Sequence, residues 1–476
     1  MKRLFSALGA MVVVFLMALP GLAKDIISNQ WEQHQLIEMK FMIDDPRPFF
    51  TNLKKLAGEE NWKRYITDVD KAKAVWADVV GFTAPEVVGK IAPEIKPGKY
   101  TLADKTRLPF DKLMPKVIYE RYNEPGQFAG NITEFEIVDT QQYYHHLGVG
   151  DNTKANDGSA KLDADGYMDY ATLKLGYPFA RPSGPQKADQ IVYNSLIESQ
   201  HLSEEFAEVV VSFGFNKKLQ MDFQGGGKYY QIKLANRSKL APLGAWYDAR
   251  AEKSGENKAY FYEATKPRDL YGNAFVNLKY QNPKKNNIFL FYTTMTRRVR
   301  KLSSSDTQDQ SIGSDSAYDD VLMFDQKYRP DLYAYDVKLL AETEILIPAY
   351  SHDGSEYADS TAGFQWRNVR MERRPVWVIE MDQQDTSYIY SKRIIYVDRE
   401  TYVPLLSENY DQKGRLWRTM QICWAFIPEV GQYTYWQTWQ YDYIDVHTTL
   451  DTNWEWLPAD TDRSQFSPKK LMRMVK

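Results

Sequence analysis

Three arginines beside an aromatic run are the first candidates for binding chemistry. Arg297, Arg298 and Arg300 follow the apolar segment Ile288–Tyr292. Guanidinium groups form bidentate hydrogen bonds with phosphate and carboxylate oxygens. At the end of an aromatic strand, Arg298 and Arg300 would place fixed positive charge at the mouth of an apolar site. The alternative is a solvated strand end whose arginines pair with the acidic segment 315–320.

Aromatic side chains alternate along the segment 433–443, which predicts a strand with one nearly all-aromatic face. Phe289 and Phe291 share a strand face in the same way. So do Trp377 and Ile379. Such a face needs either a packed layer or a bound hydrophobic molecule against it. The candidate ligand-binding residues are Phe289, Phe291, Arg298, Arg300, Trp377, Ile379, Trp439, Tyr441 and Tyr443. The alternative is that these aromatics only form the core.

The sequence lacks the common catalytic and metal-binding motifs. There is no Gly-x-Ser-x-Gly elbow, no His-Glu-x-x-His helix and no phosphate-binding glycine loop. The segment Asp163–Asp169 resembles part of a calcium loop but has no closing acid, so an ordinary Asp-Gly turn is favoured. His145 and His146 are adjacent and would point in opposite directions on a strand. We therefore expect no cofactor, no metal site and no catalytic residue.

The first residues have the three parts of a secretory signal peptide. Met1–Arg3 is positively charged, Ala7–Leu19 is apolar, and small residues precede the expected cleavage after Ala23. The next residue, Lys24, is not a cysteine, so no lipid attachment is expected. The apolar run is short for a membrane-spanning helix. We expect a protein exported to the periplasm, where it could also lie peripheral to the outer membrane.

Composition narrows the functional classes. The chain has 476 residues and a formal net charge of −3, which becomes more negative once Lys2 and Arg3 are removed. This charge gives no support for nucleic-acid binding. A single cysteine, Cys423, excludes an intramolecular disulfide, and its apolar surroundings predict a small buried hydrophobe.

The N-terminal part is predicted to be mixed. Residues 24–125 are expected to be mostly helical or irregular, with apolar residues at helical spacing between Glu59 and Val80. Thr83 and Glu86 have the spacing of a capping box at a helix start. Residues 126–204 are rich in proline and glycine and are expected to form an extended connection packed on the core.

From residue 205 to 450 the pattern predicts strands joined by short turns, followed by a tail over 451–476. The expected strands are Val209–Phe213, Lys228–Leu234, Ala259–Glu263, Ala274–Tyr280, Ile288–Thr293, Leu339–Ile347, Val376–Met381, Ile389–Val397, Leu416–Phe426 and Tyr433–Val446. Gly225–Gly227 is one of the expected turns. The predicted class is α+β and strand-dominated, an antiparallel meander rather than βαβ units.

Several motifs resemble a known group of proteins. Asp398–Trp417 resembles paired strands of the LolA/LolB lipoprotein-carrier superfamily, in which a Val-Asp-x-Glu-Thr turn precedes a strand running into Tyr-Asp-x-x-Gly. Gly176–Pro182, and Arg297–Lys301 followed by Gly313–Asp320, are similar to a periplasmic subgroup of unknown function labelled outer-membrane-lipoprotein-sorting-like. The resemblance covers roughly residues 100 to 450.

This resemblance implies a curved antiparallel half-barrel that wraps helices and encloses a hydrophobic cavity. It also implies lipid-like cargo, and members of the subgroup tend to be encoded beside transporters of the resistance-nodulation-division (RND) type. The chain departs from the carriers in its length and its added N-terminal part. The arginine that gates cargo in the carriers cannot be matched to one arginine here, so no residue role is carried over.

The favoured hypothesis is a periplasmic binding or carrier protein for a lipid or other hydrophobic molecule, not an enzyme, serving an RND-type exporter or an outer-membrane sorting pathway. Two alternatives remain. One is an exported hydrolase of envelope glycans or lipids, whose paired carboxylates could lie far apart in sequence. The other is a structural partner of an outer-membrane protein that docks through the aromatic strand.

Overall fold

The computed structural model describes residues 59–197, 204–238, 245–302, 306–311, 313–325, 334–359, 362–456 and 463–474. The expected signal peptide, residues 1–23, and its cleavage after Ala23 lie outside these residues. Within the described ranges, no helix is long and apolar enough to cross a membrane.

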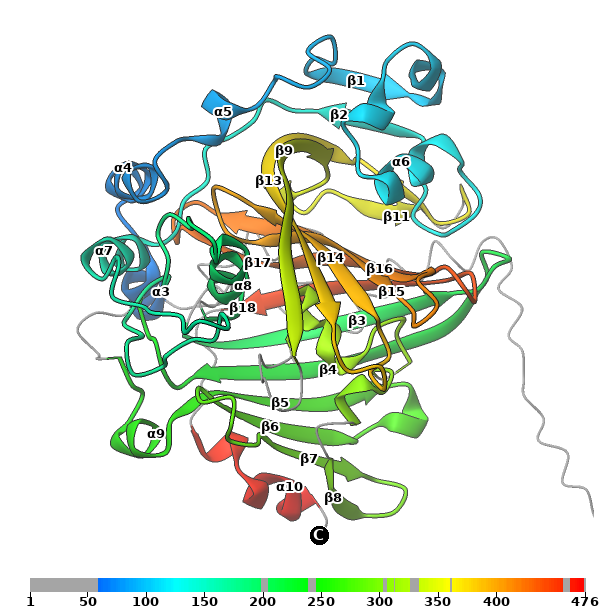
Figure 1. The fold of residues 1–476 in the computed structure, drawn as a ribbon. Coiled ribbons are helices and arrows are strands. Elements are labelled where there is room, and N and C mark those ends of the chain that lie inside the picture. Colours follow the sequence, from blue (N-terminus) through cyan, green and yellow to red (C-terminus); the bar gives the residue numbers. More distant parts are fainter. Residues whose placement is uncertain are drawn as a thin grey trace, which may run out of the picture.

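One large sheet organises the described part of the chain (Figure 1). Its strands are β1 (Gly98–Thr101), β2 (Glu134–Ile137), β3 (Glu205–Phe215), β4 (Met221–Lys233), β5 (Glu256–Lys266), β6 (Ala274–Tyr280), β7 (Ile288–Thr293), β8 (Arg298–Leu302), β9 (Tyr335–Ile347), β10 (Tyr350–Ser351), β13 (Arg370–Gln383), β14 (Lys392–Asp398), β15 (Pro404–Tyr410), β16 (Leu416–Ile427), β17 (Gln432–Asp442) and β18 (His447–Trp456). A separate hairpin consists of β11 (Tyr357–Asp359) and β12 (Gln365–Arg367).

The strand order is β1-β2-β13-β14-β15-β16-β17-β18-β3-β4-β5-β6-β7-β8, with β9 on β13 and β10 on β16. Neighbours pair antiparallel except β2 with β13 and β10 with β16. The sheet stays open, and Figure 1 shows it turning from the upright pair β9 and β13 to the nearly horizontal strands β3 to β7. The predicted strand-dominated α+β class, with a curved antiparallel half-barrel, is confirmed.

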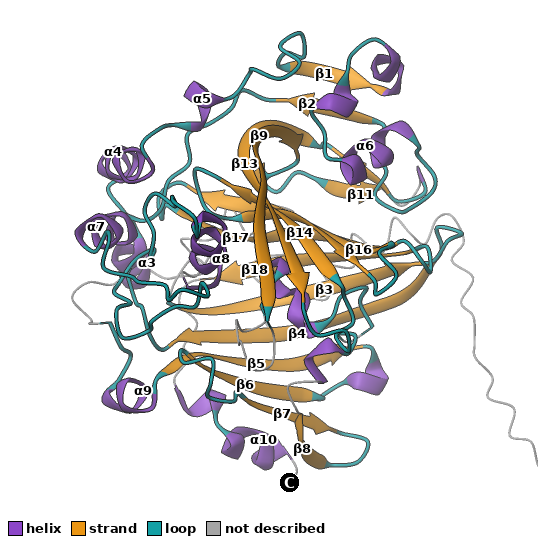
Figure 2. Cartoon of the chain, in the orientation of Figure 1, coloured by secondary structure: helices purple, strands orange, loops and turns teal. Residues whose placement is uncertain are grey.

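The helices are short and lie beside the sheet. They are α3 (Glu59–Tyr65), α4 (Val69–Val80), α5 (Ala84–Val87), α6 (Lys116–Asn123), α7 (Leu147–Ala155), α8 (Lys187–Ile197), α9 (Ala249–Ser254) and α10 (Pro468–Met474). Single 3₁₀ turns occur at Leu102–Thr106, Phe110–Lys112, Arg268–Leu270, Asp306–Gln308, Tyr318–Met323 and Arg463–Phe466. Figure 2 shows α3, α4, α7 and α8 gathered on one side of the molecule.

Capping residues mark where the N-terminal helices begin. The apolar periodicity between Glu59 and Val80 divides into α3 and α4, because Asp68 caps the start of α4 by accepting a hydrogen bond from the Lys71 amide. The Thr83 amide donates to Glu86 Oε2 at 2.8 Å, as the capping-box spacing predicted.

The expected turn at Gly225–Gly227 is wrong, because these glycines lie inside β4. A Cβ on Gly227 would lie 2.4 Å from the ring of Tyr262, and one on Gly225 would lie 2.6 Å from the ring of Phe223. The glycines therefore leave room for two aromatic rings to lie across the strand. In a strand interior, glycine commonly marks this kind of close approach.

The sheet also extends beyond the segment 205–450. β18 continues to Trp456, and β1 and β2 from the N-terminal part join the same sheet through β13. The α4 helix packs against α7, and its Trp76 is fully buried, with the indole N–H donating to the Glu400 carbonyl at 2.6 Å. The N-terminal helices and the sheet thus share one core.

Candidate functional site

A cavity of about 210 Å³ lies on one face of the sheet. Its floor comes from β3 to β7, its wall from β16 to β18, and its roof from the segment 313–325 that follows β8. The floor is mainly aromatic, and the aromatic residues that line it are Phe223, Tyr229, Tyr260, Tyr262, Phe275 and Phe289. Polar groups line both the wall and the floor. They are Thr438, Gln440, Asp451 and Asn453 on the wall, and Glu208, Ser212, Gln231 and Asn277 on the floor.

Strand register places the floor residues in rows across the sheet. One row runs Phe206, Gln231, Tyr260, Asn277, Phe289 and Leu302. The next runs Glu208, Tyr229, Tyr262, Phe275, Phe291 and Arg300. Residues directly opposite each other in antiparallel strands share a face, so both rows face the same side as the cavity.

Ring contacts join the floor to the roof. Tyr262 stacks on Phe275 with ring centroids 5.3 Å apart, and Phe275 meets Phe289 edge-to-face at 5.3 Å. Tyr318 of the roof meets Phe289 edge-to-face at 5.5 Å. These arrangements are the ones that aromatic pairs favour.

The roof is also held by its acidic residues. Asp315 Oδ2 lies 2.6 Å from His447 Nδ1 and accepts a hydrogen bond from the Thr449 hydroxyl at 2.9 Å. Asp320 accepts hydrogen bonds from the Arg393 guanidinium and from Tyr390. The hydrogen bond to Asp315 raises the pKa of His447 to about 9, so the imidazole is charged at neutral pH. The acidic segment 315–320 therefore anchors the roof at both of its ends.

Buried carboxyl groups border the cavity. The Gln440 side chain donates to Asp451 Oδ2 at 2.6 Å, and burial raises the pKa of Asp451 to about 6. Burial likewise raises the pKa of Asp319 to about 6, but this roof residue accepts a hydrogen bond from Tyr388 and does not line the cavity. Among the described residues, no group of His, Cys, Asp and Glu side chains is arranged to hold a metal ion.

Of the nine candidate residues, Phe289 lines this cavity. Phe291 lies beside it on the same sheet face, half-buried in the same aromatic cluster. Arg298 and Arg300 are exposed on β8, at the end of the strand order, where Arg300 is opposite Phe291. They share the face of the cavity but do not line it.

In the described residues, the acidic segment 315–320 does not pair with Arg298 or Arg300, as the alternative had proposed. Asp315 contacts His447 and Asp320 contacts Arg393. Arg298 and Arg300 form no ion pair with any described residue. They place exposed positive charge along a terminal strand.

Trp377 and Ile379 lie on β13, away from the main cavity. Trp377 stacks on Tyr402 at 5.7 Å, and the Arg399 guanidinium lies 5.9 Å from its ring. Ile379 borders a much smaller hollow of about 10 Å³ beside α8. They share a sheet face as expected, but that face belongs to the core.

Trp439 and Tyr441 project from the β17 face opposite the cavity, and Tyr443 directly follows this strand. The Arg121 guanidinium lies 5.3 Å from the Trp439 ring and 4.9 Å from the Tyr441 ring. A Cβ on Gly130 would lie only 2.6 Å from the Trp439 ring. Tyr443, half-buried, donates to Glu120 Oε2 at 3.2 Å. These aromatics pack against the N-terminal part of the chain, as the core alternative described.

The residues that sequence reasoning missed carry the same alternation signal. Tyr260 with Tyr262, and Tyr229 on the neighbouring strand, lie in segments predicted as strands. Their alternate spacing could have placed them on one face. Tyr435 of β17 also lines the cavity, because a bulge next to Cys423 and Trp424 changes the register of that strand.

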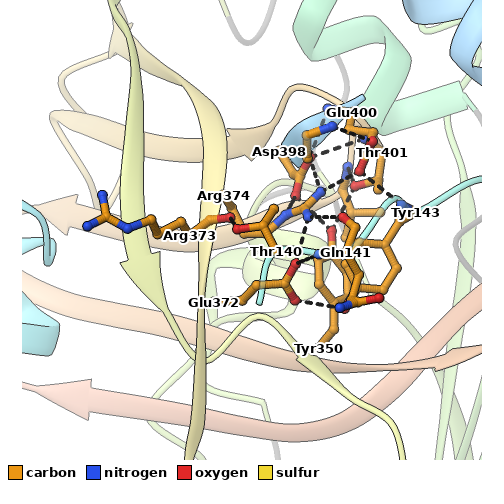
Figure 3. Close-up of polar contacts among 12 residues, drawn as sticks. Thr140, Gln141, Tyr143, Tyr350, Glu372, Arg373, Arg374, Asp398, Glu400 and Thr401 are labelled. Carbon is orange, nitrogen blue, oxygen red and sulfur yellow. Dashed lines mark hydrogen bonds and ion pairs between the residues drawn. The ribbon is translucent and has the colours of Figure 1, made fainter. Parts of the chain in front are cut away.

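A second polar region surrounds Arg374 on β13 (Figure 3). Arg374 Nε donates to Asp398 at 2.7 Å, Nη2 to Glu400 at 2.7 Å and Nη1 to Glu372 at 2.9 Å. All four side chains are at most 3% exposed. Figure 3 shows Arg374 directed into this group while Arg373 points the other way.

This Arg374 cluster joins distant parts of the chain. Glu400 also accepts hydrogen bonds from the amides of Ala84 at 2.7 Å and Tyr143 at 3.0 Å. Burial raises the pKa of Glu400 to about 7, although the Arg374 charge opposes the shift. Asp398 and Glu400 are the acids of the Asp-x-Glu-Thr turn noted in the sequence. The arrangement fixes α5 and the segment around Tyr143 to the sheet, and its burial leaves no room for a substrate.

Sequence comparison places the chain among known proteins. A family model described as "Protein of unknown function (DUF1329)" matches residues 134–472, which is more than half of the chain. The chain belongs to the DUF1329 family. This confirms the resemblance drawn from the turn motifs to a family of unknown function. No curated protein matches the sequence.

Solved structures similar to this DUF1329 protein include three bacterial proteins. A DUF1329 family protein from Desulfovibrio piger is 14% identical, covering 56% of this chain and 92% of its own, with a TM-score of 0.40. An outer membrane lipoprotein-sorting protein domain from Vibrio parahaemolyticus is 15% identical over 56% and 92%, with a TM-score of 0.39. A LolA superfamily protein from Nitrosomonas europaea is 15% identical over 60% and 98%, with a TM-score of 0.37.

Proposed function

We propose that this DUF1329 protein binds and carries a lipid or another hydrophobic molecule. The observation that supports this proposal is the cavity with an aromatic floor between β3 and β7, roofed by the segment 313–325. Its volume of about 210 Å³ far exceeds the roughly 10–15 Å³ that one water occupies by the same measure. Aromatic rings with polar hydroxyls suit a ligand that is apolar over most of its length.

The free energy gained by burying an apolar chain favours such a ligand. Burying a methylene group contributes about 0.8 kcal/mol, so a chain of several methylenes gains enough to offset the cost of binding. Tyr260, Tyr262 and Phe275 belong to one aromatic cluster on the floor, and such a chain would pack against it. The polar wall at Gln440 and Asp451 would orient the ligand by hydrogen bonding.

The proposed location is the periplasm, peripheral to the outer membrane. The leader-like residues 1–23 support export. The motif resemblance supports an RND-type exporter or an outer-membrane sorting pathway as the system that the carrier serves. Docking through the aromatic strand has less support, because β17 lies between β16 and β18 and its aromatic face is covered.

The test is binding of the neutral fluorescent probe 1-N-phenylnaphthylamine to the purified mature protein. We expect saturable binding that Thr438→Trp weakens by about tenfold or more, because the larger side chain fills the cavity. The control is Trp439→Phe, the neighbouring position on the packed face, which should leave probe affinity unchanged. Circular dichroism of both variants verifies folding.

Lipid extraction of protein purified from its own envelope, followed by mass spectrometry, supplies an independent measurement. A co-purified lipid that Thr438→Trp lacks would support the carrier function. Absence of saturable probe binding, or turnover of an envelope extract by the protein, would contradict it.

A further inference from the structure

Three lysines form a row across the floor of the sheet at one end of the cavity. Lys233 on β4 is opposite Lys258 on β5, and Lys258 is opposite Lys279 on β6. This row is adjacent to the one that contains Tyr260 and Asn277, and it faces the same side. Like charges directly opposite each other on neighbouring strands are unfavourable, so such a row needs an anion beside it.

The lysine row is largely removed from solvent. The side chains of Lys233, Lys258 and Lys279 are 3%, 17% and 10% exposed. Lys233 Nζ lies 3.9 Å from Glu204 Oε2. Lys258 and Lys279 share one carboxylate, Asp325, which Lys279 contacts directly and Lys258 approaches to 3.8 Å. Two buried ammonium groups therefore divide a single counter-charge.

Two contacts connect the row to the cavity. Asp325 belongs to the roof and lines the cavity. Tyr260, on the floor, lines it as well. The ammonium nitrogens of Lys258 and Lys279 lie 5.4 Å and 5.5 Å from the centre of the Tyr260 ring. The positive end of the site thus begins where the aromatic floor ends.

Electrostatics agree with this geometry. Burial lowers the pKa of Lys258 to about 8, and the charges of Lys279 and Lys233 add to the effect while Asp325 opposes it. A second anion beside Lys258 would restore its charge and gain the corresponding free energy. Glu208 faces the same side but is two rows away along the strands, opposite Tyr229.

We propose that the lysine row of Lys233, Lys258 and Lys279 binds the carboxylate or phosphate head group of an amphipathic ligand whose apolar body fills the aromatic cavity. This inference rests on the proposed function and specifies the chemistry of its ligand. Charged hydrogen bonds to an ammonium group are among the stronger ones available to a protein. The head group would share or replace the contacts that Asp325 now makes.

The experiment compares three ligands of nearly equal chain length that differ in the head group. Dodecanol, dodecanoate and dodecyl phosphate displace bound 1-N-phenylnaphthylamine from the protein. We expect the two anions to bind about tenfold or more tightly than the alcohol, and this preference should weaken with added salt. Lys258→Met and Lys279→Met should each abolish the preference and leave dodecanol affinity unchanged.

Two further variants make the test specific. Lys228→Met changes a lysine on β4 that projects from the opposite face, and it should keep the preference. Asp325→Asn removes the internal competitor and should increase the affinity for both anions, a gain that loss of structure cannot produce. Inorganic phosphate alone should displace no probe.

The outcomes separate the two proposals. If all three ligands displace the probe equally and Lys258→Met has no effect, the head-group inference is overturned while the carrier function stands. If none displaces the probe, or no probe binds, the carrier function fails as well. If inorganic phosphate displaces the probe as strongly as dodecyl phosphate does, the row is a site for a free anion and the amphipathic ligand is excluded.

Discussion

The two faces of strand β17 contact different surroundings although they belong to the same eleven residues. On one face Trp439 and Tyr441 pack against Arg121, with Gly130 too close to the Trp439 ring to carry a side chain. On the other face Thr438 and Gln440 border a cavity. The fully aromatic face is the one that the protein covers with its own residues, and the mixed face is the one left open to a ligand.

The two buried charge clusters differ in the same way. Arg374 is surrounded by three carboxylates that also accept hydrogen bonds from distant parts of the chain. Lys258 and Lys279 instead share Asp325. The first cluster satisfies its cation within the protein and so holds the fold together. The second places two cations beside one anion, and an anionic ligand would balance its charge.

The largest expected effect is on the Arg374 cluster. Arg374→Met would leave Glu372, Asp398 and Glu400 buried without their cation, and we expect a loss of about 3–5 kcal/mol in the free energy of unfolding. Urea denaturation measures it. The control Arg298→Met, at an exposed position on β8, should change stability by less than about 0.5 kcal/mol. Similar losses for both variants would contradict the scaffolding role of the cluster.

Truncating the packed face comes next. Trp439→Ala should cost about 3–5 kcal/mol, because the Arg121 and Gly130 contacts leave a cavity that cannot collapse easily. Phe289→Ala should cost less, since its ring already borders empty space. The same denaturation measurements decide the comparison. Equal losses would mean that the floor of the cavity is packed as tightly as the core.

Much of the fold could be predicted because alternation is a local property. Each expected strand overlaps an observed one, because aromatic and branched residues at alternate positions are a local signal. The strands β8 and β15 are not among those expected from this alternation. The glycines Gly225–Gly227 could not be placed in this way, since their role depends on the ring of Tyr262 from β5 and on how the ring of Phe223 lies along β4 itself. Alternation also does not say which face meets a ligand. It predicts a ligand contact for Trp439, whereas the neighbouring Thr438 lines the cavity.

The site depends on register, which a single sequence does not determine. Lys233, Lys258 and Lys279 are separated by more than twenty residues each, and only the pairing of β4, β5 and β6 brings them into one row. The Arg374 cluster is closer to prediction, because Asp398 and Glu400 belong to a recognisable turn motif. Nothing in the local sequence distinguishes Arg374, which enters the cluster, from Arg373, which points away from it.

An effect of intermediate size is expected from pH. Burial holds the pKa of Glu400 near 7 and those of Asp451 and Asp319 near 6. In the unfolded chain these groups lose their protons near pH 4, so between about pH 4 and about pH 7 the folded state binds more protons. Stability should therefore fall as pH rises through this window.

Urea midpoints at about pH 4, 5.5 and 7 measure this change. Asp451→Asn removes one of the three groups and should flatten the dependence by an amount on the order of 2 kcal/mol between pH 4 and pH 7. This variant separates the contributions of the two regions to the pH dependence, because Asp451 borders the cavity while Glu400 lies in the Arg374 cluster. A midpoint that rises with pH across this range would contradict the assignment.

The smallest expected effect distinguishes the two faces most directly, because it uses the same substitution on each. Gly130→Ala places a Cβ 2.6 Å from the Trp439 ring, and Gly227→Ala places one 2.4 Å from the Tyr262 ring. The Trp439 ring is enclosed, whereas the Tyr262 ring can turn into the cavity. We expect Gly227→Ala to cost about 1 kcal/mol, at the low end for overpacking, and Gly130→Ala to cost more.

Part of the Gly130 cost comes from its left-handed backbone, with φ of +78°, so stability alone does not decide the matter. Binding of 1-N-phenylnaphthylamine does. The displaced Tyr262 ring occupies volume that the ligand would use, so Gly227→Ala should weaken probe binding, while Gly130→Ala should leave it unchanged in the folded protein. If both alanines leave the affinity intact, the Tyr262 ring does not move into the cavity. The floor of the cavity would then be rigid although it borders empty space. If Gly130→Ala alone reduces binding, the packed face of the sheet is coupled to the cavity, and the contrast between the two faces of the sheet is lost.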